Sequence, residues 1–180
     1  EEPDVISGNV IGSILHKILE KNIKYEYLEK FINDQLSKEN EIINRSLSDV
    51  KEIFEEITRV IQNYYNSETF NELSPLNSFN ELEYYKKEDD YFLYGIIDKL
   101  IIEESKIIIV DYKSDKISKM NVSDKKETYF NQLLFYAYIL LNKYPNTNSF
   151  HLKLVFLRND SFTDTRILSR EEVKSFGKII

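Results

Sequence analysis

Apolar residues in the first third of the chain recur at intervals of three and four, the spacing that places them on one face of an α-helix. One such stretch predicts a first helix, capped by Ser7 or Asn9. A polar helical stretch follows over residues 25–36, and a further helix follows a cap at Ser48 or Asp49. The expected buried positions of the two apolar helices are Val10, Ile11, Ile14, Leu15, Ile18 and Leu19, and then Val50, Ile53, Phe54, Ile57, Val60, Ile61 and Tyr64.

The second half of the chain changes to strand-like patterns. Residues 66–80 are rich in Asn, Ser and Pro and predict a loop, and three strand-like runs then predict a meander at 82–86, 91–102 and 106–113. The remaining predictions are a polar loop at 116–124, an apolar helix at 127–144 that Pro145 ends, strands at 150–157 and 165–168, and a helix start at 171–176. The predicted elements come in the order helices, meander, helix and strand. This order indicates an α/β domain with a mixed β-sheet rather than a doubly wound parallel one.

Composition narrows the class of protein. The chain has 180 residues, a length typical of one domain, and 42% of them are hydrophobic, enough for a packed core. It has no cysteine, which excludes disulfides, Cys-ligated zinc and a Cys-held iron–sulfur cluster and fits a reducing, cytoplasmic location. No apolar run reaches the roughly 18 residues of a membrane span, so we expect no membrane partner. The net charge of −7 argues against a DNA-binding protein that acts through bulk positive charge.

Two neighbouring strand-like segments carry paired carboxylates. If 97–102 and 106–111 form a hairpin, Ile102 lies opposite Ile107 and Asp98 lies opposite Asp111. Directly opposite residues have Cβ atoms about 4.5–5.5 Å apart. Two carboxylates this close in partly apolar surroundings repel strongly, unless a cation lies between them.

A lysine follows one of these carboxylates on the same strand face. Lys113 lies two residues after Asp111 and therefore points to the same side. A carboxylate pair with a lysine is typical of a hydrolytic site that uses Mg²⁺ or Mn²⁺, in which the lysine steadies the attacking water or the charge that grows on a phosphate. The alternative is that both side chains simply face water at a strand end. The register match with Asp98, and Gly95 three residues before it, bring the catalytic interpretation level with this alternative.

The first helix adds a candidate metal ligand. Gly12, His16 and Glu20 are four apart, on a stripe roughly opposite the apolar face. Gly12 leaves space for another backbone or a ligand, and Glu20 could orient or supplement a ligating His16. The alternative is an ordinary exposed helical histidine.

Further polar candidates lie near the same predicted cleft. Gln132 and Tyr136 are four apart in an otherwise apolar helix, where a buried glutamine needs hydrogen-bond partners. The alternative is that this helix is only core. Glu81 or Glu83 precedes the meander and could reach the cleft, and of the two we favour Glu83.

Taken in order, these motifs resemble a known family, the RecB-type nuclease domain of the PD-(D/E)XK superfamily. The segment that begins at Asp111 looks most like the C-terminal nuclease domain of AddA-type helicase–nucleases, although Thr commonly follows the lysine there and Ser114 follows it here. The motifs are Gly12-x-x-x-His16-x-x-x-Glu20, Gly95-x-x-Asp98, Asp111-Tyr-Lys113-Ser-Asp115 and Tyr129-x-x-Gln132-x-x-x-Tyr136.

The resemblance implies a restriction-endonuclease-like fold, with a mixed β-sheet flanked by helices, and a metal-dependent site. Relatives such as AddB and certain CRISPR-associated nucleases carry four cysteines around an iron–sulfur cluster, which this chain cannot hold. The implied metal ligands are His16, Asp98, Asp111 and the main-chain carbonyl of Tyr112, with Lys113 as the catalytic lysine and Gln132 and Tyr136 in support of the site and the DNA.

The leading hypothesis is a Mg²⁺-dependent DNA exonuclease domain of a helicase–nuclease that processes double-strand breaks. The chain has no Gly-x-x-x-x-Gly-Lys-[Ser/Thr] loop, so the helicase motor would lie in the same protein or in a partner. The start at Glu1 lacks both Met and a signal peptide, so we expect residues 1–180 to be the C-terminal domain of a longer protein. The alternatives are a stand-alone RecB-like nuclease of a phage or defence system, and a nuclease-like fold that only guides DNA or a partner. The presence of Asp98, Asp111 and Lys113 argues against the last.

A group of lysines between the catalytic strand and the Gln132 helix is the expected DNA entrance. The alternative is an ordinary solvated loop. With a net charge of −7, the domain should bind DNA weakly by itself and rely on a motor to deliver the strand. These lysines are Lys113, Lys116, Lys119, Lys125 and Lys126.

Overall fold

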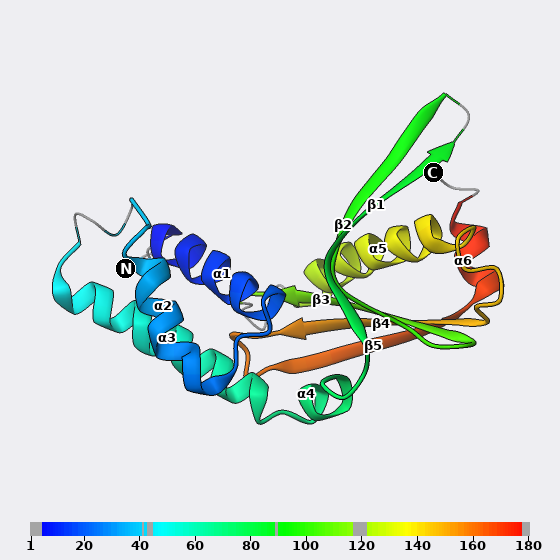
Figure 1. The fold of residues 1–180 in the computed structure, drawn as a ribbon. Helices are drawn as coiled ribbons and strands as arrows, with labels where there is room; N and C mark the ends of the chain where they lie inside the picture. The colour runs from blue at the N-terminus through cyan, green and yellow to red at the C-terminus, as the bar shows by residue number, and fades with distance from the viewer. Residues whose placement is uncertain (1–4, 41, 43–44, 89, 117–121, 178–180) are drawn as a thin grey trace. The chain divides into compact units, whose positions relative to one another are not determined.

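The computed structural model describes residues 5–40, 42, 45–88, 90–116 and 122–177, and Figure 1 shows their fold in chain order from blue to red. These residues form two compact units. The first holds those up to Ser74, together with 113–116 and 156–162, and the second holds the others. No helix within the described ranges is both long and apolar enough to span a membrane.

Helices build most of the first unit. They are α1 (Val5–Glu20), α2 (Leu28–Leu36), α3 (Leu47–Tyr65) and α4 (Glu68–Leu73), with the 3₁₀ turn η1 (Tyr25–Tyr27) before α2. The first three pack against one another, α1 and α3 through the apolar faces that the sequence predicts and α2 through Leu28, Ile32 and Leu36. Fully buried residues on these faces include Ile14, Leu15, Ile18, Ile32, Ile57 and Ile61.

The predicted starts of two helices were wrong. α1 already begins at Val5, so Ser7 and Asn9 lie inside it. Ser46, rather than Ser48 or Asp49, caps α3: its hydroxyl accepts from the main-chain nitrogen of Asp49, and the Asp49 carboxylate accepts from that of Ser46. A capping side chain contributes only about 1 kcal/mol, so packing of neighbouring residues can move a helix start.

α4 occupies part of the segment that was predicted to be a loop. The Ser67 hydroxyl accepts a hydrogen bond from the main-chain nitrogen of Phe70 and so caps the helix. The Phe70 ring packs on Tyr64 and Tyr65, with ring centroids 5.5 and 4.8 Å apart. A helix of six residues shows too little periodicity to be read from sequence, and tertiary contacts such as these stabilise it.

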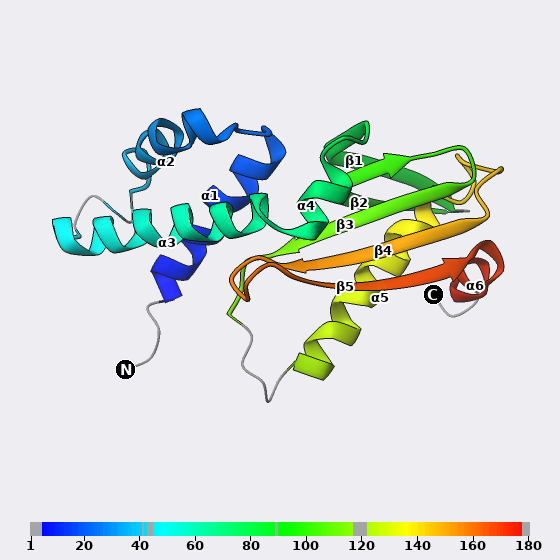
Figure 2. The ribbon, with the colours of Figure 1, turned by 90° about the horizontal axis from the view of Figure 1, so that it is seen from below.

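A five-stranded sheet forms the centre of the second unit, in the order β1-β2-β3-β4-β5 (Figure 2). The strands are β1 (Ser78–Glu88), β2 (Tyr91–Ile102), β3 (Lys106–Lys113), β4 (Ser149–Phe156) and β5 (Phe162–Ser169). β2 is antiparallel to both β1 and β3. β3 and β4 run parallel, because Asn148 donates to Ser105 near their first residues and Leu157 donates to Lys113 near their last. The predicted mixed sheet is therefore confirmed.

The outer strands are longer than the sequence predicts. β2 and β3 have the predicted bounds, whereas β1 extends the predicted 82–86 at both ends. β1 pairs with β2 from Ser78 to Glu88, and this pairing, rather than the composition of β1, sets its length. β5 likewise exceeds the predicted 165–168.

Helix α5 (Val122–Leu140) crosses one face of this sheet (Figures 1 and 2). The Lys86 ammonium lies 3.6 Å from the centre of the Tyr138 ring, so β1 and α5 meet through a cation–π contact. The helix begins and ends earlier than the predicted 127–144. Residues 122–124 of the predicted 116–124 loop open the helix, while 117–121 lie outside the described residues.

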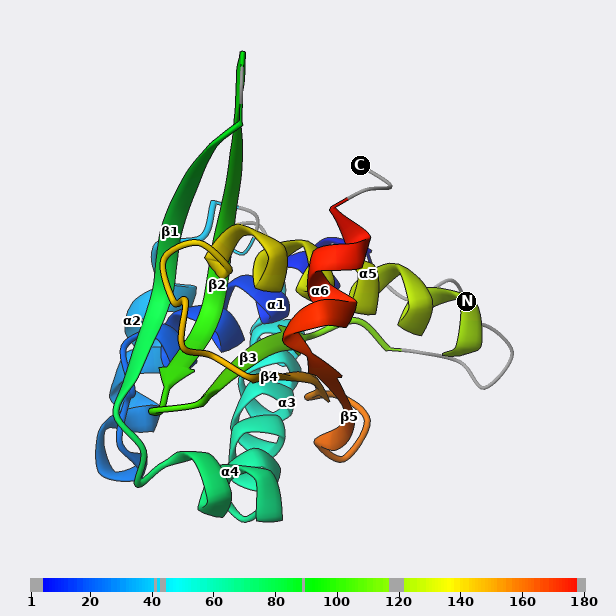
Figure 3. The ribbon, with the colours of Figure 1, turned by 90° about the vertical axis from the view of Figure 1, so that its right-hand side faces the viewer.

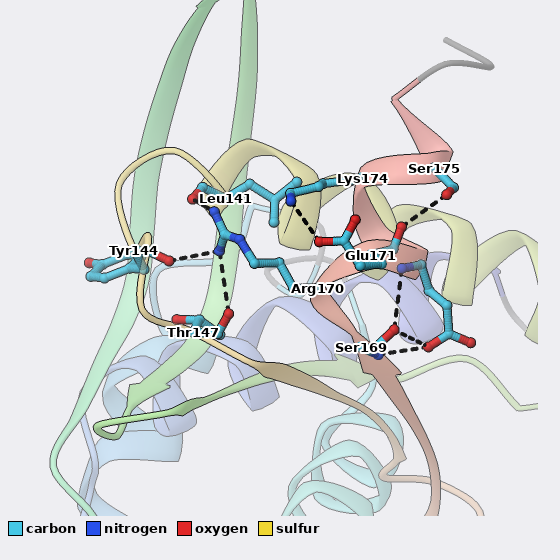
Figure 4. A network of polar contacts seen from close by, with 9 residues as sticks. Leu141, Tyr144, Thr147, Ser169, Arg170, Glu171, Lys174 and Ser175 are labelled. Carbon is cyan, nitrogen blue, oxygen red and sulfur yellow. Dashed lines mark hydrogen bonds and ion pairs between the residues drawn. The ribbon is translucent and has the colours of Figure 1, made fainter.

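Helix α6 (Arg170–Phe176) packs against α5 (Figure 3). Figure 4 shows how Arg170 holds the chain that leaves α5: its guanidinium donates to the main-chain oxygens of Leu141, Tyr144 and Thr147, at 2.8, 2.9 and 3.4 Å. These carbonyls follow the helix end, where backbone acceptors lack helical partners and a cation is favourable. The return from α5 to β4 is thus fixed by a residue that lies distant in sequence.

Candidate active site

The β2–β3 hairpin has the predicted register. Its observed pairs run from Ile102 opposite Ile107 to Lys99 opposite Val110. Continuing this register by one residue places Asp98 opposite Asp111. Asp111 is only 4% exposed, and Asp98 is half-buried. The sequence prediction of two neighbouring carboxylates in partly apolar surroundings therefore agrees with the structure.

The two carboxylates are also linked through the main chain. The Asp98 Oδ2 atom accepts a hydrogen bond of 2.7 Å from the nitrogen of Tyr112, the residue that follows Asp111. Hydrogen bonds to an ionised acceptor are among the stronger ones in proteins. This bond holds the Asp98 side chain toward β3.

A third carboxylate, Glu81, belongs to the same row. Asn80 pairs with Lys99 and Leu82 pairs with Ile97, so Glu81 lies across from Asp98 in the β1–β2 register. A carboxylate oxygen of Glu81 lies within 4.8 Å of one of Asp98. Glu81 also has a φ of +48°, in the left-handed region that a residue with a side chain rarely adopts. Such strain persists only where surrounding structure imposes it, and it is commonest at functional sites.

The structure does not bring Glu83, the glutamate favoured from the sequence, to Asp98. Glu83 is exposed, lies opposite Ile96, and accepts a hydrogen bond of 3.2 Å from the Tyr85 hydroxyl. Glu81 and Glu83 are two apart on one strand, so the sequence pattern gives both the same face. Only the pairing with β2 shows which of them meets Asp98, and a role for Glu83 in the site remains a prediction.

Two residues of α5 form a hydrogen-bonded pair within electrostatic reach of this row. The Gln132 side-chain amide donates to the Tyr136 hydroxyl at 2.8 Å. Burial raises the pKa of Tyr136, the charges of Asp111, Asp98 and Glu81 raise it further, and the Gln132 hydrogen bond opposes them. The Tyr136 hydroxyl is therefore a neutral donor at physiological pH, within the field of the three carboxylates.

Glycine at position 95 allows α5 to come this close to β2. A Cβ atom on Gly95 would lie 2.6 Å from Cε1 and 2.9 Å from Cδ1 of the Tyr136 ring. Both distances are far shorter than ordinary carbon–carbon contacts of about 3.5–4.0 Å. The Gly95-x-x-Asp98 motif thus combines a close helix contact with a carboxylate.

The catalytic-lysine candidate lies where the chain passes from the second unit to the first. β3 continues without a break to Lys113, so Lys113 shares the strand direction of Asp111. The Lys113 carbonyl accepts from the nitrogen of Leu157 at 2.9 Å. Next, the Ser114 side chain occupies the space beside Gly12 of α1, where a Cβ would lie 2.6 Å from Ser114 Oγ. Of the two occupants that the sequence allows beside Gly12, another chain segment or a ligand, the structure shows the first, the segment that follows Lys113.

Arg158 and Glu56 form an ion pair beside this segment that sequence reasoning missed. Arg158 donates to Glu56 from Nε at 2.9 Å and contacts it from Nη2 at 2.7 Å, while its Nη1 donates to the carbonyl of Ser114 at 3.4 Å. Burial by itself would raise the pKa of Glu56, but Arg158 and Lys116 outweigh it and lower the pKa. These residues are distant in sequence and carry no motif, so only the fold reveals them.

The remaining predicted site residues lie on the first unit or on α5. His16 is half-buried and Glu20 exposed on α1. Lys116 forms an ion pair with Glu56 at 3.3 Å, and Lys126 forms one with Asp164 at 2.8 Å. Lys119 lies outside the described residues. Participation of His16 and Glu20 in the metal site, and of these lysines in DNA binding, remains a prediction.

Residues 1–176 match the model of the PD-(D/E)XK nuclease superfamily. The chain belongs to this superfamily. It is also 30% identical over 156 residues to an ATP-dependent helicase/nuclease subunit from Oenococcus oeni, an alignment that covers 81% of this chain and 13% of that protein. Both the resemblance drawn from the ordered motifs and the restriction-endonuclease-like fold are therefore confirmed.

Membership of the PD-(D/E)XK nuclease superfamily gives the carboxylate row a chemical context. Nucleases of this superfamily generally use divalent metal ions. The row Glu81–Asp98–Asp111 consists of hard oxygen donors, which Mg²⁺ and Mn²⁺ prefer, and neighbouring carboxylates favour a cation between them. The donor set therefore fits such an ion, and the absence of cysteine leaves no ligands for an iron–sulfur cluster.

Proposed function

We propose that this nuclease is a Mg²⁺- or Mn²⁺-dependent DNA exonuclease domain. The observation that carries the proposal is the row of Glu81, Asp98 and Asp111 on adjacent strands, with Lys113 two residues beyond Asp111. Asp98, Asp111, Glu81, the main-chain carbonyl of Tyr112 and His16 would hold the ion. A divalent cation bound there would polarise a phosphate and stabilise the negative charge that develops in the transition state.

The protein groups around the row supply positioning and proton-donating functions. Lys113 carries a positive charge on the strand of Asp111, where it would orient a water for attack and stabilise charge on the phosphate. The Tyr136 hydroxyl, held by the Gln132 amide and neutral at physiological pH, would support the metal site from the side of α5. Glu20 would orient His16.

We also propose that the domain works within a larger cytoplasmic helicase–nuclease in double-strand-break repair and recombination. The supporting observation is its similarity to a helicase/nuclease subunit of which it spans only 13%. A motor in the same protein or in a partner subunit would unwind DNA and deliver a strand. The weak general attraction expected from a net charge of −7 fits this division of labour.

Cleavage of linear DNA by the purified chain tests the nuclease proposal. We expect degradation from the ends with Mg²⁺ or Mn²⁺, none with EDTA, and resistance of circular single-stranded DNA. Lys113→Ala should lower the rate by about 10²–10³-fold while the stabilisation by Mn²⁺ persists, because a transition-state contact is removed and not a ligand. Lys51→Ala, at a lysine that is 76% exposed on α3, is the control. Cleavage without metal, or more than a tenth of the activity in Lys113→Ala, would contradict the assignment.

A further inference from the structure

One face of the β1–β2 hairpin exposes a group of large apolar side chains. Tyr85, Phe92 and Tyr94 are 60%, 68% and 44% exposed, and Ile96 is 40% exposed. Tyr85 lies directly opposite Tyr94, and their ring centroids are 4.7 Å apart. Exposed apolar side chains lower the solubility of a protein, and apolar patches on a protein surface commonly mark interaction sites.

This aromatic face is the same face that carries the carboxylate row. Side chains alternate along a strand, so Phe92, Tyr94 and Ile96 point to the side of Asp98. On β1, Tyr85 likewise points to the side of Glu81, whose carboxylate meets that of Asp98.

The opposite face of the hairpin is covered by α5. Gly95 contacts the Tyr136 ring, and Lys86 contacts the Tyr138 ring. The hairpin therefore has one face that packs against α5 and one face whose aromatic side chains are exposed.

We propose that this face seats the bases of an unpaired DNA strand and leads that strand to the carboxylate row. The identity of the ligand as DNA rests on the proposed function. Every base of a single strand has a flat face that can stack on Tyr or Phe, whereas a duplex keeps its bases stacked inside. Tyr94 lies four residues before Asp98, roughly 13 Å along the strand, so a nucleic acid strand cut at the row would continue over the aromatic residues.

Charge also favours stacking as the source of affinity here. The face carries one acidic and one basic residue among its apolar ones, Glu83 and Lys87, and the whole chain has a net charge of −7, so phosphates find little general attraction. A ring that stacks on a base contributes affinity without a positive charge. Continuity with the carboxylate row favours a DNA strand over a protein partner as the occupant.

The test compares binding of a fluorescein-labelled single strand and of the matching duplex to the 180-residue chain. Ca²⁺ replaces Mg²⁺ so that cleavage is suppressed, and fluorescence anisotropy gives the two affinities. Tyr85→Ala/Tyr94→Ala should weaken single-strand binding by roughly 5- to 150-fold, the effect of losing one stacked base, and change duplex binding less than about twofold. Tyr85→Phe/Tyr94→Phe should bind as the wild type does, because the rings remain. Tyr27→Ala, at a tyrosine that is 59% exposed in the first unit, is the matched control.

Several outcomes would overturn the inference. They are a wild type that binds the duplex as tightly as the single strand, an alanine variant with unchanged single-strand affinity, or equal losses for the two DNA forms. Unchanged DNA affinity with lost association to a helicase motor would assign the face to a protein contact instead. Failure of the proposed function is distinguishable, since a wild type that binds single strands through these tyrosines but cuts nothing contradicts only the cleavage assignment.

Discussion

The Asp98 carboxylate accepts a hydrogen bond from the main-chain nitrogen of Tyr112, at 2.7 Å, across the β2–β3 hairpin. In a regular ladder this nitrogen would bond to a main-chain oxygen of β2. Here a side chain takes that place, next to the observed end of the pairing at Lys99–Val110. The bond couples the stability of the hairpin end to the position of a predicted metal ligand.

This coupling predicts different behaviour for two substitutions of Asp98. Asp98→Asn removes the charge but keeps an oxygen that can accept from Tyr112, so it should lose the stabilisation that Mn²⁺ gives. In EDTA its stability should stay close to that of the wild type, because the weaker hydrogen bond to a neutral acceptor offsets the relief of repulsion by Asp111 and Glu81. Asp98→Ala also loses the hydrogen bond and should lose about 1.5–3 kcal/mol of unfolding free energy in EDTA. Urea unfolding with EDTA or Mn²⁺ measures both effects. Equal stability of the two variants in EDTA would show that the bond contributes nothing.

In the absence of a metal ion, Glu81 should lower the stability of the folded protein. When a metal ion is present, Glu81 should contribute to its binding. Glu81→Asn removes one of the neighbouring negative charges, and Asn tolerates the left-handed backbone that Glu81 adopts. We therefore expect a higher melting temperature in EDTA and a smaller increase on addition of Mn²⁺. Glu83→Asn, two residues away on the same face, is the matched control and should leave the response to Mn²⁺ unchanged. The reverse result would restore Glu83, the glutamate favoured from the sequence, as the ligand.

Gly95 should be intolerant of even one added methyl group. Gly95→Ala places a Cβ 2.6 Å from the Tyr136 ring, which must move away from β2, and such overpacking typically costs about 1–3 kcal/mol. Gly8→Ala is the contrasting variant, because its nearest neighbouring atom would be 3.9 Å away and alanine favours a helix by up to about 1 kcal/mol. Thermal unfolding compares them. Equal melting temperatures for the two variants would argue against a tight β2–α5 contact.

The Glu56–Arg158 ion pair predicts a pH dependence of stability. The pKa of Glu56 is lower in the folded protein than its usual value of 4.5, so the contribution is fully present above pH 4.5 and is lost as the pH falls below it. Glu56→Gln should lose about 1–3 kcal/mol at pH 7, and its difference from the wild type should shrink at acidic pH.

The neighbouring glutamate provides the control for this measurement. Glu55 is 62% exposed and pairs with the exposed Lys51, so Glu55→Gln should change stability by no more than about 0.5 kcal/mol. Chemical unfolding of the three proteins across the acidic range measures the effect. A gap between wild type and Glu56→Gln that stays constant with pH would contradict the ionic origin of the contribution.

Local sequence patterns were sufficient to predict much of the fold and to identify the motifs in their order. The apolar periods of α1 and α3 predicted which residues are buried, because a helix must bury its apolar stripe. The runs of Ile and Val gave the bounds of β2 and β3, and the short turn between them gave the register that places Asp98 next to Asp111. Each of these depends on residues close together in sequence.

The tertiary structure decided which residues become neighbours when segments that lie far apart in the sequence pair. Glu81 and Glu83 share a strand face, and only the β1–β2 register and the left-handed backbone of Glu81 show which of them meets Asp98. Arg158 lies 102 residues from Glu56, and no local preference links the two. α4 escaped prediction because six residues give no period, and its stability comes from the packing of Phe70 on Tyr64 and Tyr65. The sequence by itself therefore determined that Asp98, Asp111 and Lys113 lie on neighbouring strands, because a short turn joins those strands. Contacts between segments distant in sequence decided which further residues surround them, and no local pattern records the energies of such contacts.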